Sequence, residues 1–138
     1  MSHFTKVKTQ LSERRHLRQA LEDLASEYRY EISEGNVHVR GYHGQTTPCQ
    51  IKLDLRNQQG YDIGFRQETP EQAFDVVADW WSGGPLANFP QQQFLDQVSQ
   101  RYAYHNLKAN LGKFQVMKEV QAHETEDGSI RILLRQVG

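Results

Sequence analysis

The sequence predicts an α+β fold, in which an antiparallel, meandering β-sheet carries two α-helices packed on one face. Apolar residues recur at helical spacing in two segments, near residues 12–28 and 88–111, while most other segments alternate apolar and polar residues as strands do. Strands that follow one another along the chain pair as antiparallel neighbours, and two helices can cover one side of the resulting sheet. At 138 residues, the chain is predicted to be a single domain, 1–138.

Alternation and turn residues predict a sheet of seven or eight strands. The expected strands cover residues 3–9, 29–32, 37–40, 51–56, 61–65, 70–81, 116–122 and 130–134. Turns at 34–36 and 127–128 predict hairpins, and a polar connection is expected at 41–48. The segment 70–81 fits the spacing of a helix and of a strand equally well, and we interpret it as a strand.

The two helices have recognisable ends. Ser12 can cap the first helix, which places Leu17, Leu21, Leu24 and Tyr28 on one face. Asn88 and Gln91 form a plausible capping pair for the second helix, and Gly112 can end it in the left-handed conformation.

The charge balance disfavours a general nucleic-acid binder. Sixteen Lys and Arg residues oppose 17 Asp and Glu residues, which gives a net charge of -1. The N-terminal region is locally basic, so weak binding of nucleic acid or phosphate is a third hypothesis for function. Its residues would be Lys6, Lys8, Arg14 and Arg15.

Several kinds of site lack a sequence signal. The single cysteine, Cys49, excludes an internal disulfide and has no activating dyad nearby, and the six histidines fall in separate elements without metal-ligand spacing. We therefore predict no metal, no cofactor and no catalytic residue. The absence of a long apolar run predicts a soluble, intracellular protein without membrane insertion.

A set of polar residues can join the second helix to the sheet. Arg101 and His105 lie four residues apart on one helix face, so an acidic strand residue such as Asp62 or Asp79 could pair with either one. We call this predicted set the polar clamp; it comprises Asp62, Asp79, Arg101, Tyr102 and His105. The clamp could lock the helix onto the sheet, or it could serve a small-ligand-binding or enzymatic site of Asp, His and Tyr.

Aromatic and polar residues also suggest a surface for protein contact. Trp80 and Trp81 would point to opposite faces of a strand, so one of them can remain exposed beside the glycine-containing loop that follows. The candidate contact residues are Tyr42, Gln45, Tyr61, Trp81, Arg101 and His105.

Several segments, taken in order, resemble one known family over nearly the whole chain. The segments are residues 1–5, 39–45, 60–65, 78–81, 100–105 and 126–131. They are similar to the family known as hypothetical chloroplast reading frame thirty-five, found in cyanobacteria and in red-algal and related plastid genomes. The resemblance implies a cyanobacterial cytoplasm or a plastid stroma and carries over no catalytic or cofactor residue.

The leading hypothesis for function is a non-enzymatic accessory protein that binds another protein. The partner would belong to the biogenesis or regulation of a photosynthetic or metabolic complex, and a homo-oligomer is also possible.

Overall fold

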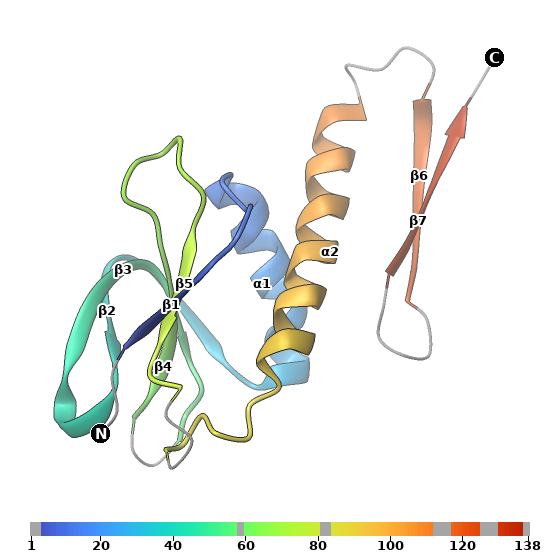
Figure 1. The fold of residues 1–138 in the computed structure, drawn as a ribbon. Coiled ribbons are helices and arrows are strands. Elements are labelled where there is room, and N and C mark those ends of the chain that lie inside the picture. Colours follow the sequence, from blue (N-terminus) through green and yellow to red (C-terminus); the bar gives the residue numbers. More distant parts are fainter. Residues whose placement is uncertain (1–3, 58–59, 81–83, 112–116, 125–129, 137–138) are drawn as a thin grey trace. The chain divides into compact units, whose positions relative to one another are not determined.

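The computed structural model describes residues 4–57, 60–80, 84–111, 117–124 and 130–136 (Figure 1). Its elements are β1 (Thr5–Lys8), α1 (Arg14–Tyr28), β2 (Glu31–Arg40), a 3-10 turn (Tyr42–Gly44), β3 (Thr46–Asp54), β4 (Asp62–Arg66), β5 (Asp75–Ala78), α2 (Gln91–Asn110), β6 (Met117–Glu124) and β7 (Ile130–Gln136). Two helices and antiparallel sheets confirm the α+β class.

The strands form two sheets. The first has five strands in the order β1-β5-β4-β3-β2, all paired antiparallel, so β2 to β5 form the predicted meander and β1 adds to its end. β6 and β7 pair with each other as a separate two-stranded sheet, so the expected sheet of seven or eight strands was wrong. Alternation indicates that a segment is a strand but does not indicate which sheet it joins.

The chain divides into two compact units. The sheet unit comprises residues 1–14 and 24–89, and the helix unit comprises residues 15–23 and 90–138, so α1 contributes to both. That the whole chain is one domain, with both helices on one face of the sheet, stays a prediction.

A β-bulge replaces the hairpin expected at 34–36. β2 is one continuous strand, and both of its halves pair with β3, with Glu34 opposite Ile51 and Val37 opposite Cys49. Between these two pairs the chain advances by three residues along β2 but by only two along β3, so β2 contains one extra residue. Gly35, within this bulge, has a positive φ of 115°. β3 consequently begins at Thr46, earlier than predicted, and only a tight turn remains of the expected connection.

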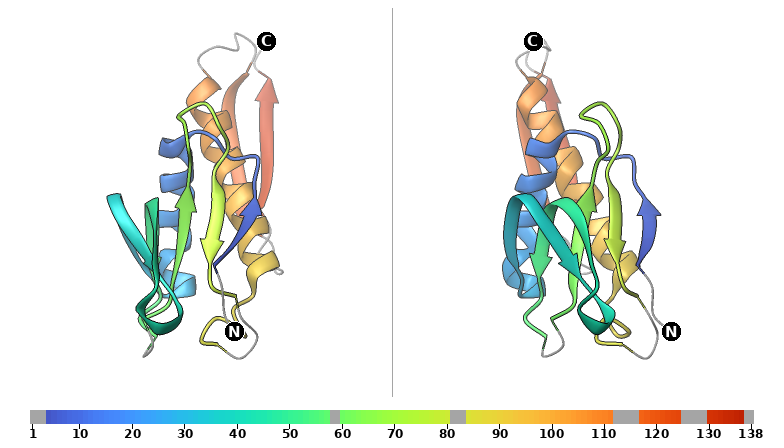
Figure 2. Two further views of the ribbon diagram at one scale, coloured as in Figure 1. Left: turned by 60° about the vertical axis from the view of Figure 1, so that its left-hand side comes forward. Right: turned by 90° about the vertical axis from the view of Figure 1, so that its left-hand side faces the viewer.

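Beyond the bulge, the β2–β3 ribbon curls over the sheet (Figure 2). Val39 and Cys49 are buried, and a Cβ atom on Gly64 of β4 would lie 2.0 Å from Val39 Cγ2 and 3.0 Å from Cys49 Sγ. The missing side chain of Gly64 therefore allows the ribbon to approach β4 closely. As a result β4 is buried along almost its whole length.

The remaining strand and cap predictions have mixed outcomes. The strand interpretation of 70–81 is confirmed for Asp75–Ala78, which pairs with both β1 and β4. The predicted side-chain caps are wrong: Glu13 and Pro90 hold the N-cap positions of the two helices, and neither makes a side-chain cap bond. Gly112, the turn at 127–128 and Trp81 lie outside the described residues.

Candidate functional site

An ion pair fixes the end of β2 against β4. The guanidinium of Arg40 donates two parallel hydrogen bonds to Asp62, from Nε to Oδ2 and from Nη2 to Oδ1, each 2.8 Å long. The backbone N–H of Arg40 donates a third bond of 2.9 Å to Oδ2. Asp62 is fully buried, so these charge-assisted bonds replace the water that its carboxylate lost on folding. The bonds to Asp62 are also the main cause of the raised pKa of Arg40.

A second buried carboxylate, that of Asp79, holds the turn that follows Arg40. Asp79, at the end of β5, accepts a hydrogen bond of 3.2 Å from the backbone N–H of Tyr42. A Cβ atom on Gly41 would lie 2.9 Å from the ring of Phe4 and 3.2 Å from Cβ of Asp79, so a larger residue does not fit there without displacement. Gly41 N–H also donates to the carbonyl of Gln45 at 2.9 Å, which closes the turn.

We define residues 41–45 as the ribbon tip. The side chains of His43 and Gln45 are exposed, and Tyr42 is half-buried with its ring centroid 4.0 Å from that of His43. His43 and Gly44 have positive φ values of 54° and 73°. The tip thus has a backbone fixed from inside the sheet unit, two exposed polar side chains and one half-buried tyrosine.

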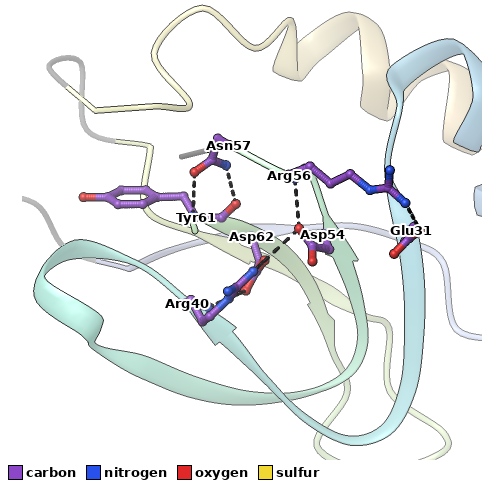
Figure 3. A network of polar contacts seen from close by, with 7 residues as sticks. All are labelled: Glu31, Arg40, Asp54, Arg56, Asn57, Tyr61 and Asp62. Carbon is purple, nitrogen blue, oxygen red and sulfur yellow. Dashed lines mark hydrogen bonds and ion pairs between the residues drawn. The ribbon is translucent and has the colours of Figure 1, made fainter. Parts of the chain in front are cut away.

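The turn before β4 is held by similar bonds, as Figure 3 shows. The amide of Asn57 accepts from the N–H of Tyr61 at 2.8 Å and donates to its carbonyl at 2.6 Å. Only 5% of the surface of Tyr61 is accessible to solvent, so this residue offers little surface to a partner. Asp54 lies beside Arg40 and accepts from the N–H of Arg56, whose side chain pairs with Glu31.

In the helix unit, α1 and α2 meet through polar and aromatic side chains. His105 Nε2 lies 2.7 Å from Asp23 Oδ2, and the ring of His16 packs edge-on against Tyr102 at 5.8 Å. The sequence predicted an acidic strand residue such as Asp62 or Asp79 as a partner of Arg101 or His105, whereas His105 pairs with Asp23 of α1. Asp23 lies in an amphipathic helix that carries charges of both signs, so the sequence pattern gave no separate signal for it.

The predicted residues therefore fall into two groups. Tyr42, Asp62 and Asp79 meet at the base of the ribbon tip, and His105 lies in the helix pair. Asp62 pairs with Arg40, and its proposed membership of the polar clamp with α2 stays a prediction. Arg101 and Tyr102 are half-buried on α2, and their membership of one polar clamp with Asp79 stays a prediction.

Trp80 belongs to an aromatic cluster of the sheet unit. Its ring centroid lies 6.0 Å from that of Phe89, which in turn lies 5.7 Å from Tyr28. The indole Nε1 of Trp80 is buried and finds no hydrogen-bond partner among the residues that the structure describes.

Cys49 has the surroundings of a core cysteine. Burial raises the pKa of its thiol from 9.0 to about 11, and Sγ donates to the carbonyl of Ile51 at 3.3 Å. The thiol is therefore neutral near pH 7 and a poor nucleophile.

Two kinds of feature are absent from the described part of the chain. No group of three or more His, Cys, Asp or Glu side chains in it is placed to hold a metal ion. Neither of its helices combines the length and apolar character needed to cross a membrane.

Comparison with known proteins identifies the family. A family model described as a protein of unknown function (DUF1257) matches residues 20–133. Relatives named uncharacterized protein ycf35 align over 99% of this chain and 98% of their own, at 34% identity in Guillardia theta, 29% in Cyanophora paradoxa and 27% in Pyropia yezoensis. No solved structure matches. These matches confirm the resemblance, and the chain therefore belongs to the DUF1257 family of proteins of unknown function, together with the ycf35 proteins of these algae.

Proposed function

We propose that this protein is a non-enzymatic accessory protein that binds another protein through its ribbon tip. Its partner belongs to the biogenesis or regulation of a photosynthetic or metabolic complex. We place it in a cyanobacterial cytoplasm or a plastid stroma, which the ycf35 names of its relatives support.

One observation carries the proposal: the tip is held from within by two buried carboxylates, while the side chains of His43 and Gln45 are exposed. Asp62 accepts a hydrogen bond of 2.9 Å from the backbone N–H of Arg40, and Asp79 accepts one of 3.2 Å from the backbone N–H of Tyr42. A loop whose backbone is already ordered loses less conformational entropy on binding than a loose loop does. Fixing an exposed loop in this way favours recognition.

The chemistry of the tip suits a protein surface. Tyr42 combines a large ring with a hydroxyl, and tyrosine is enriched among the residues that dominate binding energy at interfaces. His43 and Gln45 add donors and acceptors without a fixed charge. Trp81 lies two residues beyond Asp79 in the sequence and remains a proposed contact, as does Arg101.

Photo-crosslinking in cells of the native organism tests the proposal. The tagged full-length protein carries a photoreactive residue at position 45 and is purified after irradiation at moderate salt, and mass spectrometry identifies the crosslinked protein. The matched control carries the same residue at position 72, another exposed glutamine of the sheet unit. We expect one partner to crosslink reproducibly from position 45 and not from position 72.

Binding of the purified partner then tests the residues. We expect His43→Ala and Gln45→Ala each to weaken binding about tenfold, which is the scale of a lost interface hydrogen bond or anchor, and Gln72→Ala to change it less than twofold. The same assay applies to Trp81→Ala and Arg101→Ala. Equal affinity of all tip variants would refute the assigned surface, and a crosslink only to a second copy would show a homo-oligomer instead.

A further inference from the structure

The helix unit contains a cavity of about 490 Å³ that the proposed protein contact does not use. Three of its lining residues come from α1 and three from α2: Arg15, His16, Gln19, His105, Lys108 and Ala109. A cavity of this size is within the range of small-molecule sites, and it is several times larger than a single inorganic ion needs. Its walls determine which ligand chemistry it can accept.

The cavity walls carry positive charge that has no carboxylate partner among the described residues. Arg15 and Lys108 are exposed, and neither makes an ion pair within the described residues; the ammonium of Lys108 lies 5.8 Å from the ring centroid of Tyr104. Four other arginines do have carboxylate partners, namely Arg14, Arg18, Arg40 and Arg56. No carboxylate lines this cavity among the residues that are described.

Other polar groups in the same walls can complete an anion site. His105 Nε2 lies 2.7 Å from Asp23 Oδ2, and because a carboxylate only accepts, this nitrogen carries the proton. The pair fixes the orientation of the ring, and a ring that carries a proton on both nitrogens also offers Nδ1–H to an anion. His16 is buried, and its Nδ1 lies 3.4 Å from Oε1 of Gln19, whose amide also has N–H groups to donate.

We propose that this cavity binds the phosphate group of a phosphorylated small molecule. Arg15 and Lys108 supply the charge, and His105 and Gln19 supply directed donors. A phosphate dianion matches this set because arginine binds its oxygens in pairs and lysine binds them as a point charge. The rest of the cavity has room for the organic part of the ligand. The site does not depend on the ribbon tip, so either proposal can fail alone.

The N-terminal basic stretch proposed from the sequence is a different site. It would place phosphate on Lys6, Lys8, Arg14 and Arg15, but Arg14 pairs with Glu34 at 2.8 Å and only Arg15 lines the cavity. Lys8 is exposed and does not line this cavity. Replacing Lys8 therefore distinguishes phosphate binding by the N-terminal stretch from phosphate binding in the cavity.

NMR titration of the full-length protein tests the cavity. Inorganic phosphate and adenosine 5′-monophosphate are added at constant ionic strength, with sodium chloride as the reference salt, while the imidazole signals of His16 and His105 are followed. We expect saturable shifts of both signals, at lower concentration with the monophosphate. Arg15→Ala and Lys108→Ala should each weaken monophosphate binding about tenfold or more, since each removes a charge-assisted contact.

Two control variants sharpen the result. Lys108→Arg, which keeps the charge, should stay within about threefold of the wild type, and Lys8→Ala should not change binding. Absence of saturable His16 and His105 shifts with both probes would overturn the proposal. So would equal losses from Lys8→Ala and Lys108→Ala. If a short single-stranded oligonucleotide binds more tightly than the monophosphate, with steep salt dependence, the basic residues of the cavity bind nucleic acid and the proposal is wrong.

Discussion

At the scale of single residues, the two members of the Arg40–Asp62 pair differ in their access to water. The side chain of Arg40 retains 43% of its exposure, whereas that of Asp62 retains none. If Asp62 lost its partner, it would be a buried charge held by one backbone N–H. If Arg40 lost its partner, it would still reach solvent and Asp54 at 3.6 Å. Removing the arginine should therefore lower the free energy of unfolding by more than neutralising the aspartate does.

We expect Arg40→Met to lower the free energy of unfolding by about 3 kcal/mol or more, because it leaves a buried charge without a counter-ion. Asp62→Asn should lower it by about 1–2 kcal/mol, since the amide oxygen can still accept from the backbone of residue 40. Urea unfolding of both variants and of the double variant measures these values. A double variant as unstable as the sum of the two would show that the pair is not coupled.

The buried thiol of Cys49 makes stability depend on alkaline pH. Its pKa is about 11 in the folded chain and 9.0 as the ordinary value. Between these values the unfolded chain has released the proton while the folded chain keeps it, so the free energy of unfolding falls as pH rises. Below pH 9 both states are protonated and this contribution is fully present.

Comparing the wild type with Cys49→Ala isolates this effect from the lysines and tyrosines that titrate in the same range. Between pH 8 and pH 10.5 the wild type should lose more stability than the variant, by at most about 2 kcal/mol. Urea unfolding at the two pH values gives the difference. Parallel losses in both proteins would mean that Cys49 ionises equally well in the folded and unfolded chains.

At the scale of elements, the close approach of the ribbon to β4 depends on Gly64. A methyl group there would overlap with Val39 Cγ2, so Gly64→Ala should destabilise the protein by about 1–3 kcal/mol. Val39→Ala removes the overlapping atom. The double variant should therefore be more stable than the sum of the single changes predicts, by about 1 kcal/mol.

Gly35→Ala provides the control for backbone strain. Gly35 has a positive φ of 115°, and a Cβ atom there would meet nothing within 4 Å. Its replacement should cost stability through strain alone and should add to the cost of Val39→Ala. Additive behaviour of Gly64→Ala with Val39→Ala would contradict the packing described for the ribbon.

The sequence predicted most elements because their signals are local. Alternation located β4 and β7, since burial on a sheet follows a period of two, and both strands pair with their neighbours in sequence. It could not distinguish a turn at Gly35 from a bulge, because a short polar, glycine-containing interruption suits both. The helix caps failed because residues that can cap do so only when the backbone places them at the helix end.

The candidate site was predictable in its residues but not in its partners. Asp62 and Asp79 are predicted as acidic strand residues that could pair with the second helix, and both are buried and bonded. Their partners, Arg40 and Tyr42, come from a ribbon that reaches them only because it curls beyond the bulge. A contact that depends on curvature between distant segments leaves no trace in local periodicity.

At the scale of the whole molecule, a chain that forms one domain should unfold its sheet unit and its helix unit together. The two units share α1, whose residues 15–23 belong to the helix unit while 24–28 belong to the sheet unit. A single domain unfolds in one cooperative step, so damage in one unit exposes the core of the other. Cys49, buried in the sheet unit, can report such exposure through its reaction with a thiol reagent.

Val98 of α2 is fully buried in the helix unit, so Val98→Ala should cost about 2 kcal/mol. If the chain is one domain, this substitution also lowers the free energy of opening the sheet unit by about 2 kcal/mol, so the open form is about 30 times more populated. Cys49 should then react with the thiol reagent about 30 times faster, provided that the chain recloses faster than the reagent labels it. Ser99→Ala, an exposed neighbour on α2, should leave the rate unchanged. An unchanged rate in Val98→Ala, together with early loss of helical signal, would instead show two domains, because the helix unit would then open without exposing the core beneath the ribbon.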